Sequence, residues 1–153
     1  MRRIFAASAL SVLMLGGAAA AQSNPPSQAS DTALARKLGA DQRGMRNYVL
    51  VILKTGPHRN PDGPGRDEMF KGHFANIKRL ADEGKLVVAG PFDDKNDWRG
   101  MFIFAVETPE EAARLVSTDP VIRYGEMVPE YHRLYSSAAL MAVSELHQKI
   151  APQ

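Results

Sequence analysis

The sequence predicts an α+β fold whose elements follow the order strand, helix, strand, strand, helix, strand. Two continuous apolar runs, at residues 48–53 and 100–106, predict strands that are buried on both faces of a sheet. Between these runs, residues 66–92 are typical of one helix, one tight turn and one strand. Beyond them, residues 108–135 contain a second helix, a short turn and a last strand. Each element follows from a local pattern.

The helix that begins near residue 66 carries apolar side chains at steps of three and four residues, which places them on one face. These residues are Phe70, Phe74, Ile77 and Ala81. We expect this face to point inward. His73 lies at the edge of the same face, and we expect it to be neither fully inside nor fully outside.

Glycine and proline divide the region around this helix. The loop at residues 55–65 contains three prolines and three glycines, which prevent regular structure, and we expect its polar side chains to face water. Gly84 suits the left-handed position that ends a helix. Residues 86–89 form a short apolar strand, and Gly90 and Pro91 are expected to stop it.

The second helix has a well-marked start. Thr108 can cap it, Pro109 fits the first helical position, and Glu111 stands three residues after the cap. The helix ends near residue 117. Asp119 and Pro120 then begin another short turn, which ends before the last strand.

The last strand and a final helix complete the pattern. The strand covers residues 126–135, and Pro129 within it indicates a bulge or an edge position. Residues 138–150 predict an amphipathic helix. Its apolar side carries Leu140, Val143, Leu146 and Ile150.

Together these elements predict a ferredoxin-like βαββαβ fold, with a four-stranded antiparallel sheet and two helices on one face. The two helices cover one face only, yet two strands are apolar on both faces. Something must therefore cover the second face, because a large apolar patch would otherwise meet water. We favour a second copy of the chain, which gives a homodimer. The chain's own C-terminal helix is the alternative cover.

The N-terminus is typical of a secretory signal peptide. Two arginines precede an apolar stretch, and small residues up to Ala21 form a cleavage site, so residues 1–21 are predicted to be removed. An uncleaved anchor is the alternative, although the stretch is short for a membrane span. Residues 22–46 are read as a disordered tether with a helical turn around residues 33–38, residues 47–136 as the folded domain and 137–153 as a C-terminal helix. We therefore expect a periplasmic or secreted protein without membrane contact.

Composition narrows the possible functions. Removal of residues 1–21 takes away two arginines and no acid, so 19 − 2 = 17 basic residues balance 17 acidic ones. This balance does not favour nucleic acid as a partner. The chain has no cysteine, so disulfides and thiolate chemistry are excluded. Its four histidines lack zinc-like spacing, and no phosphate-binding loop is present, so we expect neither a metal nor a cofactor.

Four motifs carry a family resemblance. They are YVLVILKTGP, HFxxIxxLADEGKLVVAGPF, RGMFIFxVxTxEEA and DPVxxxG, in this order between residues 48 and 135. The chain resembles the YciI (YCII-related) family, whose members are similar to dimeric α+β barrel proteins that pair through their sheets. The resemblance implies a catalytic pair formed by a histidine on the first helix and an aspartate in the Asp-Pro step, here His73 and Asp119.

Such a pair suits proton transfer, because a carboxylate on one imidazole nitrogen fixes the tautomer and the other nitrogen can take a proton. The simpler alternative is that the histidine satisfies a backbone carbonyl and the aspartate only caps its turn. Gly90, Pro91, Arg99 and Tyr131 are candidates to line a substrate pocket. We predict a small-molecule lyase or isomerase that needs no cofactor, with an unidentified ligand. A non-catalytic ligand-binding or structural module is the alternative.

Overall fold

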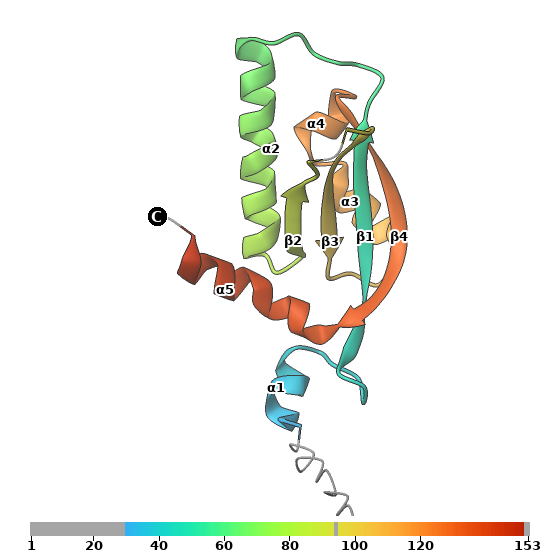
Figure 1. The fold of residues 1–153 in the computed structure, drawn as a ribbon, viewed down its shortest axis with the longest axis vertical. Helices are drawn as coiled ribbons and strands as arrows, with labels where there is room; N and C mark the ends of the chain where they lie inside the picture. Colours follow the sequence, from blue (N-terminus) through green and yellow to red (C-terminus); the bar gives the residue numbers. More distant parts are fainter. Residues whose placement is uncertain (1–29, 94, 152–153) are drawn as a thin grey trace, which may run out of the picture.

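The computed structural model describes residues 30–93 and 95–151 (Figure 1). The predicted signal segment 1–21 and the first part of the predicted tether, 22–29, lie outside the described residues. In the part of the chain that is described, no helix is both long and apolar enough to cross a membrane.

One four-stranded antiparallel sheet forms the centre of the protein. Its strands are β1 (Met45–Thr55), β2 (Leu86–Pro91), β3 (Trp98–Phe104) and β4 (Met127–Ser137), in the order β2-β3-β1-β4. Helices α2 (Pro64–Asp82) and α3 (Pro109–Val116), with the short α4 (Pro120–Arg123), pack on one face of this sheet (Figure 1). The predicted ferredoxin-like arrangement is confirmed.

Strand β1 is central and buried on both faces, as its continuous apolar run predicted. Val49, Val51 and Leu53 point toward the helices and join the main core. Tyr48 points to the opposite face, where it belongs to a second cluster with Val87 and Ile103. Because side chains alternate along a strand, a run without polar residues supplies both clusters at once.

The C-terminal segment covers part of the second face. It starts as a 3-10 helix, η1 (Ala138–Ala142), in which Leu140 and Met141 pack on the second cluster, and continues as α5 (Val143–Ile150). Only the first part of the predicted apolar side packs on the sheet, since Leu146 is 57% exposed and Ile150 80% exposed. The reason is that α5 runs away from the sheet (Figure 1). A second copy of the chain as further cover stays a prediction.

The predicted inward face of helix α2 is correct in part, since Phe70 and Ile77 pack against the main core. The buried residues of the helix are Met69, His73, Asn76 and Leu80, so the histidine lies inside rather than at an edge. Phe74, expected to point inward, is 63% exposed. The buried positions therefore include two polar residues, His73 and Asn76, which hydrophobic periodicity does not identify.

Strand β2 does not stop at Gly90 and Pro91, as the sequence predicted, but includes both. Pro91 pairs in register with Gly100 of β3. Proline is tolerated here because β2 is an edge strand. One side of this strand has no neighbouring strand, so a residue without a backbone N–H costs no hydrogen bond on that side. Pro129 also lies on an edge strand, β4, as expected.

Residues 30–46 are ordered, although the sequence predicted a disordered tether there apart from one helical turn. They contain a short helix, α1 (Thr32–Lys37), capped by Asp31, and the first two residues of β1. Backbone and side-chain bonds attach this segment to the end of β4. Tyr135 donates a hydrogen bond to Asp41, and the Ala138 N–H donates to the Gly44 carbonyl over 2.9 Å. Polar composition indicated disorder, but these contacts order the segment.

Candidate active site

His73 projects from the middle of α2 toward the sheet and is 7% exposed. Aromatic side chains surround its ring. The Phe70 ring meets it edge-on with 5.9 Å between centroids, and the Phe74 and Phe102 rings lie at 5.3 Å and 6.1 Å. A histidine in such apolar surroundings needs a polar partner, because an unpaired buried polar group is costly.

Asp119 is that partner, and it is fully buried at the N-cap of α4. Its Oδ1 accepts a hydrogen bond from the Val121 N–H at 3.1 Å, and its Oδ2 lies 2.8 Å from His73 Nδ1. When Asp119 is ionised its carboxylate can only accept, which requires a proton on His73 Nδ1 and leaves Nε2 for another partner. Both residues are in the same chain, which the sequence left open.

Gly72 allows the two elements to approach. A Cβ atom built at this position would lie 3.0 Å from Cγ of Pro120, which is tighter than almost all real contacts. A larger residue would push α4 away from α2 and lengthen the contact between His73 and Asp119. The glycine next to the histidine therefore helps to set the geometry of the pair.

A cavity of about 370 Å³ lies against His73 and reaches the ends of β2 and β3. Gly90, Pro91 and Arg99, which the sequence suggested as pocket residues, all line it. Tyr131 does not line this cavity. It packs against the main core instead, and burial raises the pKa of its hydroxyl. The other lining residues are apolar or glycine: Leu53, Phe70, Phe74, Ile77, Ala89, Gly100, Phe102 and Met127.

Arg99 occupies an irregular position in β3. Leu53 pairs with Gly100 and the next residue of β1 pairs with Trp98, so Arg99 is an extra residue in the ladder. Such bulges re-aim side chains and are common beside functional sites. Among the described residues, no acceptor lies within hydrogen-bonding or ion-pairing distance of its side chain. Arg99 is therefore a cation at the cavity that forms no ion pair with an acid in residues 30–93 or 95–151.

A second buried carboxylate, Glu126, was not identified from the sequence. It is 1% exposed. Its Oε2 accepts from the Asn60 N–H at 2.8 Å and from Asn60 Nδ2 at 3.2 Å. Its Oε1 accepts from Arg66 Nη2 at 2.9 Å and Nε at 3.3 Å. The sequence feature that could have indicated this role for Glu126 is the long loop at residues 55–65. Buried backbone N–H groups of such a loop need hydrogen-bond acceptors, and a carboxylate can supply them.

Two opposing effects act on the pKa of Glu126. Desolvation by burial raises the pKa, but the hydrogen bonds from Asn60 and Arg66, together with the charge of Arg66, outweigh it and lower the pKa. The carboxylate is therefore ionised in the folded protein near neutral pH and holds the 55–65 loop against the start of β4. No group of three or more histidine or acidic side chains in the described residues is arranged to hold a metal ion.

Comparisons with known proteins give distant similarities. No family model matches the chain. An uncharacterized protein, YjpA, from Bacillus subtilis (strain 168) is 27% identical over 81 residues, which are 53% of this chain and 85% of the relative. A solved 5-chloro-2-hydroxyhydroquinone dehydrochlorinase from Burkholderia phenoliruptrix AC1100, in complex with 2,5-dihydroxybenzoquinone, is 24% identical. That match covers 57% of this chain and 92% of the dehydrochlorinase, with a TM-score of 0.42.

Proposed function

We propose that the protein is a small-molecule lyase or isomerase in which His73 transfers a proton and Asp119 holds the imidazole in position. The observation that supports this proposal is the 2.8 Å contact between His73 Nδ1 and Asp119 Oδ2 on a ring that also lines a cavity. A carboxylate that only capped α4 would leave the imidazole without this partner. A histidine that only satisfied a backbone carbonyl would not need a buried acid.

The proposed chemistry begins with proton abstraction. His73 Nε2 takes a proton from a carbon atom next to a carbonyl group, and the electron pair of that C–H bond moves toward the carbonyl. Asp119 stabilises the imidazolium that forms, without itself taking a proton. In an isomerase, His73 returns the proton to a different carbon. In a lyase, the electron pair expels a leaving group from the neighbouring carbon, and the proton later passes to solvent.

The apolar wall of the cavity supports this reaction. It limits the water around the reacting atoms, which strengthens electrostatic interactions between the substrate and the protein. Arg99 can stabilise negative charge that develops on a carbonyl oxygen, because its guanidinium is always protonated. The phenylalanine rings suit a substrate of low polarity.

Turnover of a compound panel tests the proposal. The panel contains small ketones, keto acids and halogenated acids, and the readouts are deuterium exchange and product formation by NMR. We expect turnover of at least one compound and a loss of at least about 100-fold in His73→Gln. The control is His132→Gln, which removes an exposed histidine that bonds Glu130 on β4. Binding of a compound without turnover, or equal rates in His73→Gln, would favour the non-catalytic ligand-binding module.

A further inference from the structure

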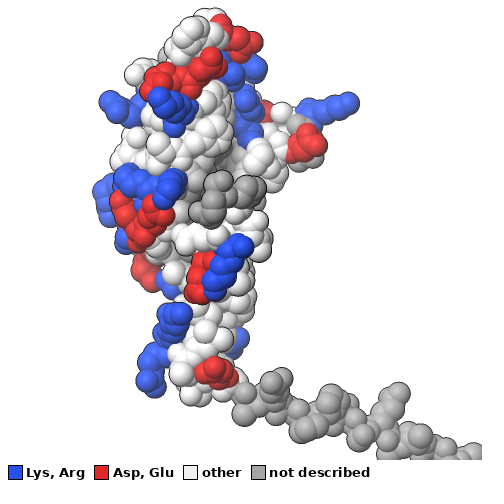
Figure 2. Space-filling view, turned by 90° about the vertical axis from the view of Figure 1, so that its left-hand side faces the viewer, with Lys and Arg blue, Asp and Glu red and all other residues white. Residues whose placement is uncertain are grey.

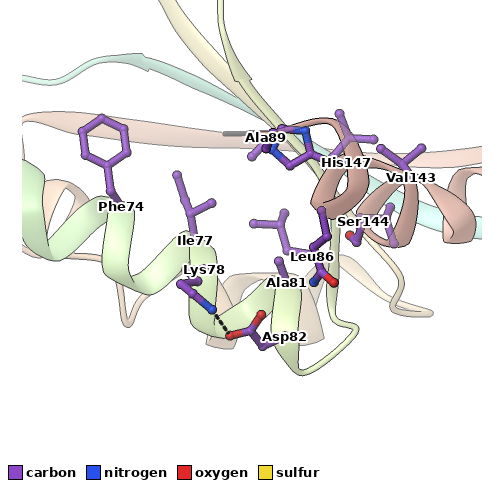
Figure 3. A pocket seen from close by; sticks show the side chains of 14 residues that line it. Phe74, Ile77, Lys78, Ala81, Asp82, Leu86, Ala89, Val143, Ser144 and His147 are labelled. Atoms are coloured by element: carbon purple, nitrogen blue, oxygen red, sulfur yellow. Dashed lines mark hydrogen bonds and ion pairs between the residues drawn. The ribbon is translucent and has the colours of Figure 1, made fainter. Parts of the chain in front are cut away.

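A second and larger cavity lies next to the His73 cavity. We call it the α2–α5 groove, and its volume is about 810 Å³. Helix α2 forms one wall, the edge strand β2 forms the floor, and α5 forms the other wall (Figure 3). Its lining residues are Phe74, Ile77, Lys78, Ala81, Asp82, Leu86, Val87, Val88, Ala89, Val143, Ser144, His147, Gln148 and Ala151.

The groove and the His73 cavity border the same residues. Phe74, Ile77 and Ala89 line both of them. Phe74 is 63% exposed, and its ring lies 5.3 Å from the ring of His73. The Phe74 ring lies between the buried His73 and the groove. Because most of this ring is exposed, it forms part of the cavity walls rather than part of the core.

The apolar stripe on α2 connects the two spaces. Phe70 lines only the His73 cavity, Phe74 and Ile77 line both, and Ala81 lines only the groove. At the rise of an α-helix, this stripe is about 16 Å long. Phe70 and Ile77 also pack against the main core, and the outer side of this stripe forms a continuous apolar wall from the candidate active site to α5.

The charged residues at the groove neutralise one another. Lys78 Nζ lies 2.6 Å from Asp82 Oδ2 at the exposed rim of the groove, so the two opposite charges offset each other there (Figure 3). Figure 2 shows the side of the molecule to which α2 and α5 belong, and there basic and acidic side chains lie in mixed groups. The α2 wall and the β2 floor are otherwise apolar, whereas α5 adds the polar Ser144, His147 and Gln148. The groove thus suits an uncharged chain that lies along α2 and β2.

We infer that the substrate is an elongated molecule whose reacting carbonyl end lies at His73 and whose apolar chain lies in the α2–α5 groove. This inference rests on the proposed function for the position of the reacting end. It assigns α5 a role in substrate specificity. The apolar chain gains affinity by leaving water, and the groove supplies the surface that covers it.

Binding of three methyl ketones tests the inference in the full chain. For 2-pentanone, 2-heptanone and 2-nonanone, we expect the affinity to rise about fourfold for each added methylene, measured by NMR titration. Ala81→Leu fills the groove and should weaken 2-nonanone about tenfold, with little effect on 2-pentanone. Val143→Ser, on the opposite wall, should reduce the gain per methylene without adding bulk.

Ala75→Leu is the matched control. It makes the same change on the same helix, at an exposed position that lines neither cavity, and should leave all three affinities unchanged. Equal affinity for the three ketones, or an equal loss for all of them in Ala81→Leu, would overturn the inference. Light scattering adds a further outcome. If Ala81→Leu dissociates a dimer that Ala75→Leu leaves intact, the groove belongs to a second copy of the chain.

The same samples separate this inference from the proposed function. Deuterium exchange beside the ketone carbonyl reports on proton transfer by His73, whereas the dependence of affinity on chain length reports on the groove. Length dependence without exchange keeps the groove as a binding site for apolar chains and rejects the acid/base role. Exchange without length dependence keeps the acid/base role and rejects the groove as part of the site.

Discussion

Two buried carboxylates, Asp119 and Glu126, lie on either side of α4 and have different surroundings. Glu126 accepts four hydrogen bonds from Asn60 and Arg66, so both of its oxygens are satisfied within the protein. Asp119 also uses both oxygens, but one of them meets an imidazole whose other nitrogen has no partner among the described residues. That imidazole lines a cavity.

This difference in hydrogen bonding distinguishes a buried carboxylate with a structural role from one with a candidate functional role. A buried carboxylate whose partners are all saturated holds two segments together, as Glu126 holds the 55–65 loop to the start of β4. A buried carboxylate that orients a group with free hydrogen-bonding capacity leaves that capacity for a ligand. Burial alone does not distinguish the two, because both acids are almost completely inaccessible.

The largest effect on stability is expected from the structural acid. Glu126→Ala leaves Arg66 and the Asn60 amide without their acceptor, so the free energy of unfolding should fall by about 3 kcal/mol. Urea unfolding followed by circular dichroism measures this loss. Glu130→Ala is the control, since it removes an exposed acid that pairs with Lys54 at 3.2 Å, and it should hardly shift the midpoint. Similar losses in both variants would contradict an anchoring role for Glu126.

A smaller loss of stability is expected at the candidate active site. In Asp119→Asn the side chain can still cap α4, but the charge-assisted bond to His73 is weakened, so unfolding should become easier by about 2 kcal/mol. The decisive readout is the ring of His73. Its nitrogen chemical shifts should report a proton on Nδ1 in the parent protein and a mixture of tautomers in the variant. An unchanged ring signal would show that Asp119 does not orient the imidazole.

The smallest effect concerns acid pH. The pKa of Glu126 is lower in the folded protein than its ordinary value, which is near 4.3 in unfolded chains. Its stabilisation is therefore fully present above that value and is lost as the pH falls through the folded pKa. The difference in unfolding free energy between the parent and Glu126→Gln should shrink below about pH 4.3. A difference that stays constant down to the acid transition would contradict the lowered pKa.

Local sequence patterns determined the order of the elements and several of their ends. Thr108 accepts from the Glu111 N–H as its spacing predicted, and Asp119 caps α4 through the Val121 N–H. These contacts join residues that are two or three positions apart, so the sequence contains all the information they need. The continuous apolar run of β1 likewise determined that this strand has a core on both faces.

Only the tertiary structure decided which side of α2 is buried and that Glu126 binds Arg66. It also supplied the geometry of the His73–Asp119 pair, which the family resemblance had implied. Each of these depends on groups far apart in the sequence, such as His73 and Asp119, whose distance is set by the packing of α4 on α2. Periodicity shows that a helix has an apolar face, but it does not identify the polar residues of α2 that packing against the sheet buries. The stripe that begins at Phe70 lines the cavities in addition to packing on the core, which no local pattern could reveal.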